Sequence, residues 1–222
     1  GFSSVPFGFY EEFQVKTGGY SVEFGRSTGG VINAVTRRGS NEFKAGIQTT
    51  FEPAAWRAEG DDQFYADGSV NVRSSHDRSS FNKVNAWGSG PLVKDKLFLF
   101  AMYEWRDSSS RFTNASGSSL SRRESDNGFW GGKLDWQITD DHLLELLAFS
   151  DEGDSSTNLY TYNFAASTVG SAPTSLSTSS GGGKSGSITY TGHFGESFTA
   201  KAMYGINRSS SYVLSPADEL CN

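Results

Sequence analysis

The sequence has little cysteine, little proline and no long apolar run, and these shortages exclude several classes of protein. Of the 222 residues, one is cysteine and five are proline. The single cysteine, Cys221, excludes a disulfide framework and a thiolate metal cluster within this chain. It is either an unpaired thiol or has a partner outside this sequence. No run of about eighteen apolar residues is present to form a membrane-spanning helix.

Basic charge and clustered histidine are also scarce. The formal net charge is -6, so nothing supports nucleic-acid binding through a basic surface, and we expect no nucleic-acid partner. The three histidines, His76, His142 and His193, lie far apart and lack the spacing of paired metal ligands. No nucleophile and base occur in a recognisable arrangement. We therefore expect no metal, no cofactor and no enzymatic activity.

Glycine, aromatic residues and alternating apolar positions are abundant instead. Side chains alternate between the two faces of a strand, so apolar residues at every second position predict strands with one apolar and one polar face. Around residues 130–138, tryptophan, leucine and isoleucine alternate with Lys133, Asp135 and Gln137. The pattern predicts an all-β, antiparallel fold with about seven strands in its main part. These strands are expected near residues 42–52, 68–90, 96–107, 128–138, 142–150, 186–194 and 197–207.

The connections between these strands alternate between short and long. Tight connections are expected at residues 94–96, 139–141 and 195–197, and long polar loops at residues 52–68, 107–127 and 151–183. This alternation is typical of an outer-membrane β-barrel, which has short periplasmic turns and long extracellular loops. Trp105 and Trp130, near strand ends, favour an interfacial aromatic girdle over ligand stacking. For Tyr160 and Tyr162, expected inside a long loop, a structural role and ligand stacking both stay open.

A glycine-rich stretch from residue 18 to residue 38 precedes these strands. It has glycine pairs at 18–19 and 29–30 and a further glycine at 25, and then the apolar run Val31–Thr36. Glycine allows tight turns, and a short β-branched run predicts a strand buried on both faces. The alternative is a phosphate-binding loop, which requires lysine and a hydroxyl residue after the last glycine. Val31 and Ile32 stand at those positions, so nucleotide binding is disfavoured.

The same stretch resembles the end of the plug domain of TonB-dependent outer-membrane receptors. The resemblance rests on Phe24-Gly25, on the Gly-Gly-Val-Ile-Asn run of residues 29–33, and on Thr36-Arg37-Arg38. The wording of residues 23–30 is most similar to the Oar-like branch, and residues 90–100 resemble an early barrel hairpin of that branch. The resemblance implies that residues 1–40 end a plug domain. Residues 41–222 would then be the first strands of a transmembrane β-barrel of about twenty-two strands, and the chain a piece of a longer protein.

The function implied by the resemblance is import across the outer membrane of a Gram-negative bacterium, energised by the inner-membrane proton-motive force. The implied partners are outer-membrane lipid, an unknown extracellular ligand and the TonB energy-coupling complex, whose contact segment lies outside this chain. Two alternatives stay open: an Oar-like surface protein in adhesion or protein handling, and a secreted soluble β-sandwich that binds glycans. The sequence does not identify the substrate.

The resemblance also assigns roles to particular residues. The plug gate would comprise Gly18, Gly19, Gly25, Arg26, Gly29, Gly30 and Asn33. The lumen-facing wall would include Lys133, Asp135, Gln137 and Thr189.

Overall fold

The computed structural model of the chain describes residues 5–17 and 30–216. The fold is all-β with antiparallel pairing throughout the described residues, as the sequence predicts, and it consists of one ten-stranded sheet and two two-stranded sheets. Among these residues no helix is long and apolar enough to cross a membrane. Two short 3-10 turns, η1 (Phe7–Phe9) and η3 (Ala54–Trp56), are the helical elements that the structure describes.

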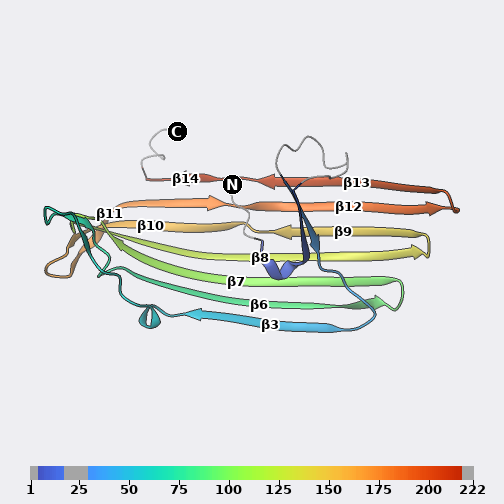
Figure 1. Cartoon of the computed structure of the whole chain (residues 1–222), viewed down its shortest axis with the longest axis horizontal. Coiled ribbons are helices and arrows are strands. Elements are labelled where there is room, and N and C mark those ends of the chain that lie inside the picture. Colours follow the sequence, from blue (N-terminus) through green and yellow to red (C-terminus); the bar gives the residue numbers. More distant parts are fainter. Residues whose placement is uncertain (1–4, 18–29, 217–222) are drawn as a thin grey trace.

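The large sheet contains all the long strands, which run side by side in Figure 1. In chain order they are β3 (Lys44–Glu52), β6 (Arg78–Val93), β7 (Leu97–Thr113), β8 (Ser119–Thr139), β9 (His142–Ser150), β10 (Gly153–Asn163), β11 (Thr168–Gly181), β12 (Gly183–Phe194), β13 (Phe198–Ser209) and β14 (Tyr212–Leu214). Within the described residues, β3 pairs only with β6 and β13 only with β12, so the sheet stays open at both edges.

Three pairs of these segments are continuations of one strand. Ser150 lies opposite Trp130 and Gly153 opposite Asn127, so the register on β8 runs unbroken from β9 into β10. β11 and β12 likewise keep one register along β9 and β10, with Gly182 between them at a φ of +89°. β13 and β14 do the same along β12 and β11. The sheet therefore has the seven long strands that the sequence predicts.

Two of the predicted long loops are wrong, because the strands continue into them. β7 continues to Thr113 and β8 already begins at Ser119, so the loop expected at residues 107–127 is a hairpin with a short turn. β10 and β11 occupy the loop expected at residues 151–183 and also form a hairpin. Both extensions are rich in serine, threonine and charged residues, so they lack the apolar alternation that marks a strand in the sequence.

The remaining predicted boundaries agree more closely with the structure. The tight connections at residues 94–96, 139–141 and 195–197 are confirmed, and Asp95 and Gly195 adopt the left-handed backbone that such turns favour. The strand predicted at residues 68–90 is split into β5 (Val70–Val72) and β6, with a turn at residues 74–77 closed by the Asp77 amide on the Ser74 carbonyl. β5 pairs with the two-residue β4 (Gln63–Phe64) in its own small sheet.

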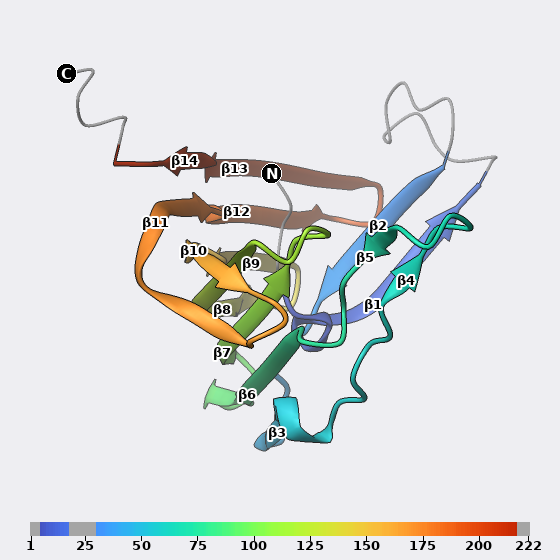
Figure 2. The same ribbon diagram turned by 90° about the vertical axis from the view of Figure 1, so that its left-hand side faces the viewer.

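The two faces of the large sheet differ in chemistry. Figure 2 shows the sheet end-on and strongly curved. The convex face carries a row of apolar residues that lie directly opposite one another across five strands: Leu99, Leu134, Leu146, Ile188 and Tyr204. At the edge strand, Ile47 on the same face is 76% exposed. The concave face carries the charged and aromatic residues described below.

A small sheet of β1 (Tyr10–Lys16) and β2 (Val31–Thr36) lies on the concave side of the large sheet, as Figure 2 shows. The prediction that Val31–Thr36 is a strand is confirmed, but the prediction that both its faces are buried is wrong, since Ile32 is 70% exposed. The apolar run indicates a strand without indicating how many faces are covered. Within the described residues β2 pairs only with β1, which leaves part of it open.

Candidate functional site

The candidate site is the contact between the amino-terminal segment and the concave face of the large sheet. We call it the docking site; it comprises Phe9 and Arg38 from the amino-terminal segment, and Phe100, Phe129 and Asp135 from β7 and β8. It brings together residues that are far apart in the sequence, and Arg38 and Asp135 are 97 positions apart. No other cluster of buried apolar residues is recorded in the part of the chain that the structure describes.

Phe9 is the apolar anchor of the docking site. The 3-10 turn η1 holds it, with the Phe9 amide donating to the Pro6 carbonyl at 3.0 Å. Its ring is fully buried and lies 5.0 Å from the Phe129 ring and 5.8 Å from the Phe100 ring between centroids. Gly131 leaves the space for this ring, because a β-carbon there would stand 2.6 Å from Phe9 Cε2. The anchor therefore depends on one aromatic residue facing one glycine.

Tyr10 follows Phe9 and packs against it edge to face, with 5.9 Å between ring centroids. Burial raises the pKa of the Tyr10 phenol, and the Asp151 carboxylate raises it further. Because that pKa lies above the ordinary tyrosine value, the phenol stays neutral over the physiological pH range. The Tyr10 phenol, next to the Phe9 anchor, thus adds no charge to the apolar part of the docking site.

Arg37, Arg38 and Gly39 form the second contact, where the chain leaves β2 for the large sheet. The Arg37 guanidinium lies over the Trp87 ring at 5.2 Å, a cation–π geometry. Arg38 Nε donates to Asp135 Oδ2 at 3.1 Å. Gly39 lies against the backbone of β7, since a β-carbon there would stand 2.7 Å from the Leu99 carbonyl oxygen.

Asp135 is the electrostatic centre of this second contact. Its side chain is 1% exposed, and burying an unpaired carboxylate is costly, so its partners matter. Lys133 Nζ lies 3.6 Å from Asp135 Oδ1, which accepts no hydrogen bond from any residue that the structure describes. The same ammonium donates to Glu145 Oε1 at 2.7 Å. The lysine contact to Asp135 is thus ionic without being a hydrogen bond. Arg38 supplies the only charged hydrogen bond recorded to this carboxylate among the described residues.

A second buried carboxylate, Glu104, lies on the same face of β7. It is 1% exposed, accepts a hydrogen bond from Asn85 Nδ2 at 3.0 Å and is paired with Arg106. Glu104, Asn85 and Phe9 were not among the residues predicted for the site. The sequence does contain a pattern that indicates Glu104 and Asn85, because polar residues at every second position of an otherwise apolar strand mark its polar face.

The predicted lumen-facing residues share the concave face but divide between several environments. Lys133 and Asp135 belong to the ionic contacts just described, and Thr189 is buried opposite Glu145 in the register of β12 and β9. Gln137 lies at the end of β8, where its amide donates to the Thr139 carbonyl at 2.7 Å. The structure thus brings Lys133 and Asp135 together and places Gln137 at a turn.

Most of the predicted gate lies outside the described residues, namely Gly18, Gly19, Gly25, Arg26 and Gly29. Gly30 begins the described part, and a β-carbon there would approach the Lys16 carbonyl oxygen to 3.2 Å, which is tighter than ordinary contact. Asn33 is half-buried in β2, opposite Gln14 of β1.

Tyr160 and Tyr162 lie in strand β10, so their predicted position in a loop is wrong. Tyr162 is 7% exposed, and its hydroxyl is 2.7 Å from Nδ1 of His76, whose ring stacks on Phe164 at 4.1 Å. Tyr162 thus ties the β10–β11 hairpin to the turn before β6. Tyr160 is half-buried beneath the Arg122 guanidinium, which lies 5.1 Å from its ring centroid.

Comparison with known proteins relates part of the chain to a transporter. Over 99 residues the chain is 38% identical to the TonB-dependent transporter Oar of Myxococcus xanthus. The match covers 45% of this chain and 9% of that protein. The sequence matches no protein-family model, and no solved structure matches it. Part of the chain is therefore related to a TonB-dependent transporter.

Proposed function

We propose that this chain is part of a TonB-dependent outer-membrane receptor of the Oar-like branch, which imports a substrate across the Gram-negative outer membrane. In this proposal residues 1–40 belong to the plug domain, and residues 41–222 are the first strands of the barrel. One observation carries the proposal: the amino-terminal segment docks through Phe9 and Arg38 on the polar concave face of a sheet whose convex face is apolar. The relationship of part of the chain to the Oar transporter supports it.

The apolar band on the convex face approaches the height of the apolar band in outer-membrane barrels. On β8 it extends from Trp130 to Ile138, both exposed. At about 3.4 Å per residue this is about 27 Å along the strand, or about 20 Å across the membrane when the strand is tilted by about 40°. The apolar band of outer-membrane barrels is about 25 Å tall. A soluble β-sandwich would cover this face with a second sheet, and within the described residues nothing covers it.

Aromatic residues mark one border of this band. Tyr103 lies directly opposite Trp130 across β7 and β8, and Trp105 follows one row farther along, with its indole nitrogen donating to Asp126 Oδ1 at 3.1 Å. A ring with an apolar body and a polar group suits the membrane interface. We assign these three residues to the aromatic girdle, and lipid is the partner of the surface between this girdle and the tight turns.

In this proposal the docking site keeps the plug bound to the barrel wall. Opening the lumen requires the Phe9 ring to leave its aromatic surroundings and the Arg38–Asp135 pair to separate. Both changes expose groups that are now buried, so the plug would stay docked until work is done on it. The TonB complex would supply that work from the proton-motive force.

The test is energised uptake by the full-length protein in intact cells. Candidate substrates are supplied outside the cell, and accumulation is measured before and after the proton-motive force is dissipated with an uncoupler. We expect accumulation to stop upon dissipation, since an importer of this kind depends on energy from the inner membrane. Accumulation that survives dissipation would indicate a passive pore and would refute active import.

The same assay separates the importer from the Oar-like surface protein in adhesion or protein handling. If the chain belongs to such a surface protein, adhesion or protein processing requires the protein, and no small substrate accumulates in the cells. A soluble glycan-binding protein would be separated earlier, because it would purify without detergent and would not show heat-modifiable migration.

A further inference from the structure

A cavity of about 300 Å³ lies beyond the aromatic girdle, where the hairpins continue past the apolar band. Its lining is arginine-rich and comes from β6, β7, β8 and the η3 turn. The lining includes Arg78, Ser109, Arg111, Arg122 and Glu124. Neither the transport proposal nor the docking site uses any of them.

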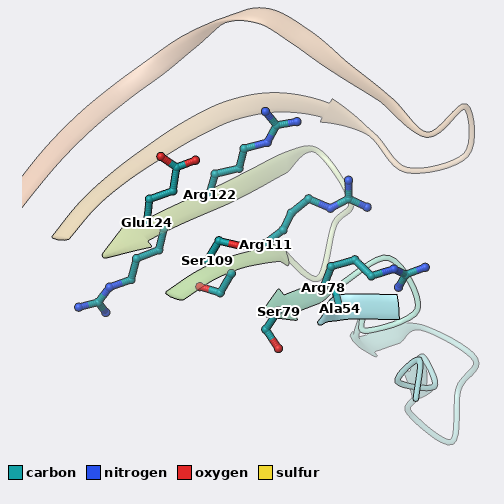
Figure 3. A pocket seen from close by; sticks show the side chains of 9 residues that line it. Ala54, Arg78, Ser79, Ser109, Arg111, Arg122 and Glu124 are labelled. Atoms are coloured by element: carbon teal, nitrogen blue, oxygen red, sulfur yellow. The ribbon is translucent and has the colours of Figure 1, made fainter. Parts of the chain in front are cut away.

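Three of these arginines form a row across the sheet. Arg78 lies directly opposite Arg111, and Arg111 lies directly opposite Arg122. Figure 3 shows the three side chains extending one after another from neighbouring strands. Directly opposite residues in an antiparallel pair have β-carbons about 5 Å apart, and like charges at that separation destabilise the sheet. The row therefore favours binding of an anion between the guanidinium groups.

The partners of the row leave much of its charge unneutralised. Arg78 is paired with the exposed Glu59. Arg111 Nη2 donates to the His76 carbonyl oxygen at 2.9 Å, and Arg122 stacks on Tyr160. Among the described residues, no carboxylate forms a salt bridge with Arg111 or Arg122. The hydrogen bond to the His76 carbonyl fixes the orientation of the Arg111 guanidinium. Because a carbonyl oxygen is uncharged, the positive charge of Arg111 stays available to a ligand.

The groups next to the row define the chemistry of the ligand. Ser80 and Ser109 form the next row towards the membrane band, with their hydroxyl oxygens 2.8 Å apart, and Glu124 lies opposite Ser109. Hydroxyl donors beside several guanidinium groups suit an oxyanion with three or more acceptor oxygens, for which arginine has matched bidentate geometry. Glu124 is the one acidic residue lining the cavity, so it opposes anion binding.

We propose that this cavity is a binding site for a phosphate-bearing ligand. Arg111 and Arg122 hold the phosphate oxygens, Arg78 closes one side, and Glu124 weakens the affinity. The phosphate belongs either to a lipid headgroup or to a soluble compound. Arg111 lies six residues beyond Trp105 on β7, which corresponds to about 20 Å along the strand. The site therefore stands outside the apolar band and open to soluble compounds, and a lipid phosphate reaches it only from a headgroup that extends well beyond the girdle.

The row of acidic residues nearer the band is a different feature. Asp107, Asp126 and Asp154 lie opposite one another on β7, β8 and β10. No group of three or more acidic, histidine or cysteine side chains in the described part of the chain could hold a metal ion. These aspartates repel free anions from the girdle and so favour the arginine row as the place where a phosphate binds.

The test uses the full-length protein in nanodiscs and titrates inorganic pyrophosphate by calorimetry. In phosphatidylcholine discs we expect saturable binding that weakens about tenfold in Arg122→Gln, because one charge-assisted contact is lost. Glu124→Gln should strengthen binding. The matched control is Arg208→Gln on β13, which removes the same charge outside the cavity and should leave the affinity unchanged. Arg122→Lys, which keeps the charge, replaces Arg122→Gln if the latter does not fold.

A second measurement identifies the source of the phosphate. Discs that contain phosphatidic acid are titrated in the same way, and lipid retention is recorded by native mass spectrometry. A weaker apparent pyrophosphate affinity, with phosphatidic acid retained through Arg122, would support the lipid source. Equal affinity in both discs would support the soluble source. The proposal is overturned if neither pyrophosphate nor phosphatidic acid binds in an Arg122-dependent way, or if Arg208→Gln weakens binding as much as Arg122→Gln. None of these results depends on transport, so a failure here leaves the proposed function untouched.

Discussion

Replacing Phe9 by alanine is the sharpest test of the docking site. The Phe9 ring is fully buried among the rings of Phe100, Phe129 and Phe149, and Gly131 leaves its space. Burial of an aromatic side chain removes about 150–250 Å² from water, which at about 25 cal/mol per Å² corresponds to about 4–6 kcal/mol. Measured phenylalanine-to-alanine substitutions in cores cost about 3–5 kcal/mol. We take about 3 kcal/mol as the lower bound for the loss of docking free energy.

A loss of about 3 kcal/mol raises the ratio of undocked to docked amino-terminal segment by about 150-fold. Hydrogen exchange of the β1 and β2 amides in the full-length protein should measure this directly, because exchange through undocking follows the undocked fraction. Phe7→Ala is the matched control, since Phe7 belongs to the same 3-10 turn and its ring is 83% exposed. Unchanged exchange in Phe9→Ala, or equal acceleration in Phe7→Ala, would refute the role of Phe9 as the anchor.

Three further predictions address the membrane band, the loops and the orientation. Leu134→Arg should destabilise the assembled full-length protein by about 2–4 kcal/mol, measured by heat-modifiable migration, whereas Gln137→Arg on the concave face should cost much less; equal losses would contradict the assignment of the faces. The Ser74 and Ser75 amides donate to Asp62 Oδ1, and these hydrogen bonds, the Ser75 backbone bond first, lower the pKa of Asp62. The stability gained is therefore present above the unfolded-state pKa and is lost as the pH falls through the lower folded-state value. Amide exchange at Ser74 and Ser75 should show this loss, and Asp62→Asn should abolish the pH dependence. Protease sites inserted at residues 164–167 should be cleaved on intact cells, whereas sites at Asp140 or Glu196 should be cut only after the outer membrane is opened; the reverse pattern would invert the orientation.

The strands could be predicted from the sequence wherever apolar residues recur at every second position. This condition holds inside the band, for example from Trp130 to Ile138, and there the predicted and observed strands agree closely. It fails in β10 and β11, where serine and threonine occupy both faces and interrupt the apolar alternation. A polar strand and a polar loop have the same composition, so the sequence could not distinguish them.

The docking site could be predicted only in part, for a related reason. Alternation places Lys133 and Asp135 on one face of β8, because that inference needs only neighbouring positions. Their pairing with Arg38 and the packing of Phe9 on Phe129 depend on how a distant segment folds back over the sheet. Local periodicity contains no information about such contacts, so Phe9 and Arg38 emerged only from the structure.

The unbroken register through the interruptions at residues 151–152 and at Gly182 has a consequence for how this protein can diversify. The β10–β11 hairpin takes its register from β9 and β12, which continue into it. Insertions or deletions of equal length in β10 and β11 therefore leave the residue pairs between β9 and β12 unchanged. This hairpin can therefore lengthen, shorten or change its composition without disturbing the pairs below it. The part of the sheet with alternating apolar residues would keep a nearly constant length, because its apolar face must match its surroundings.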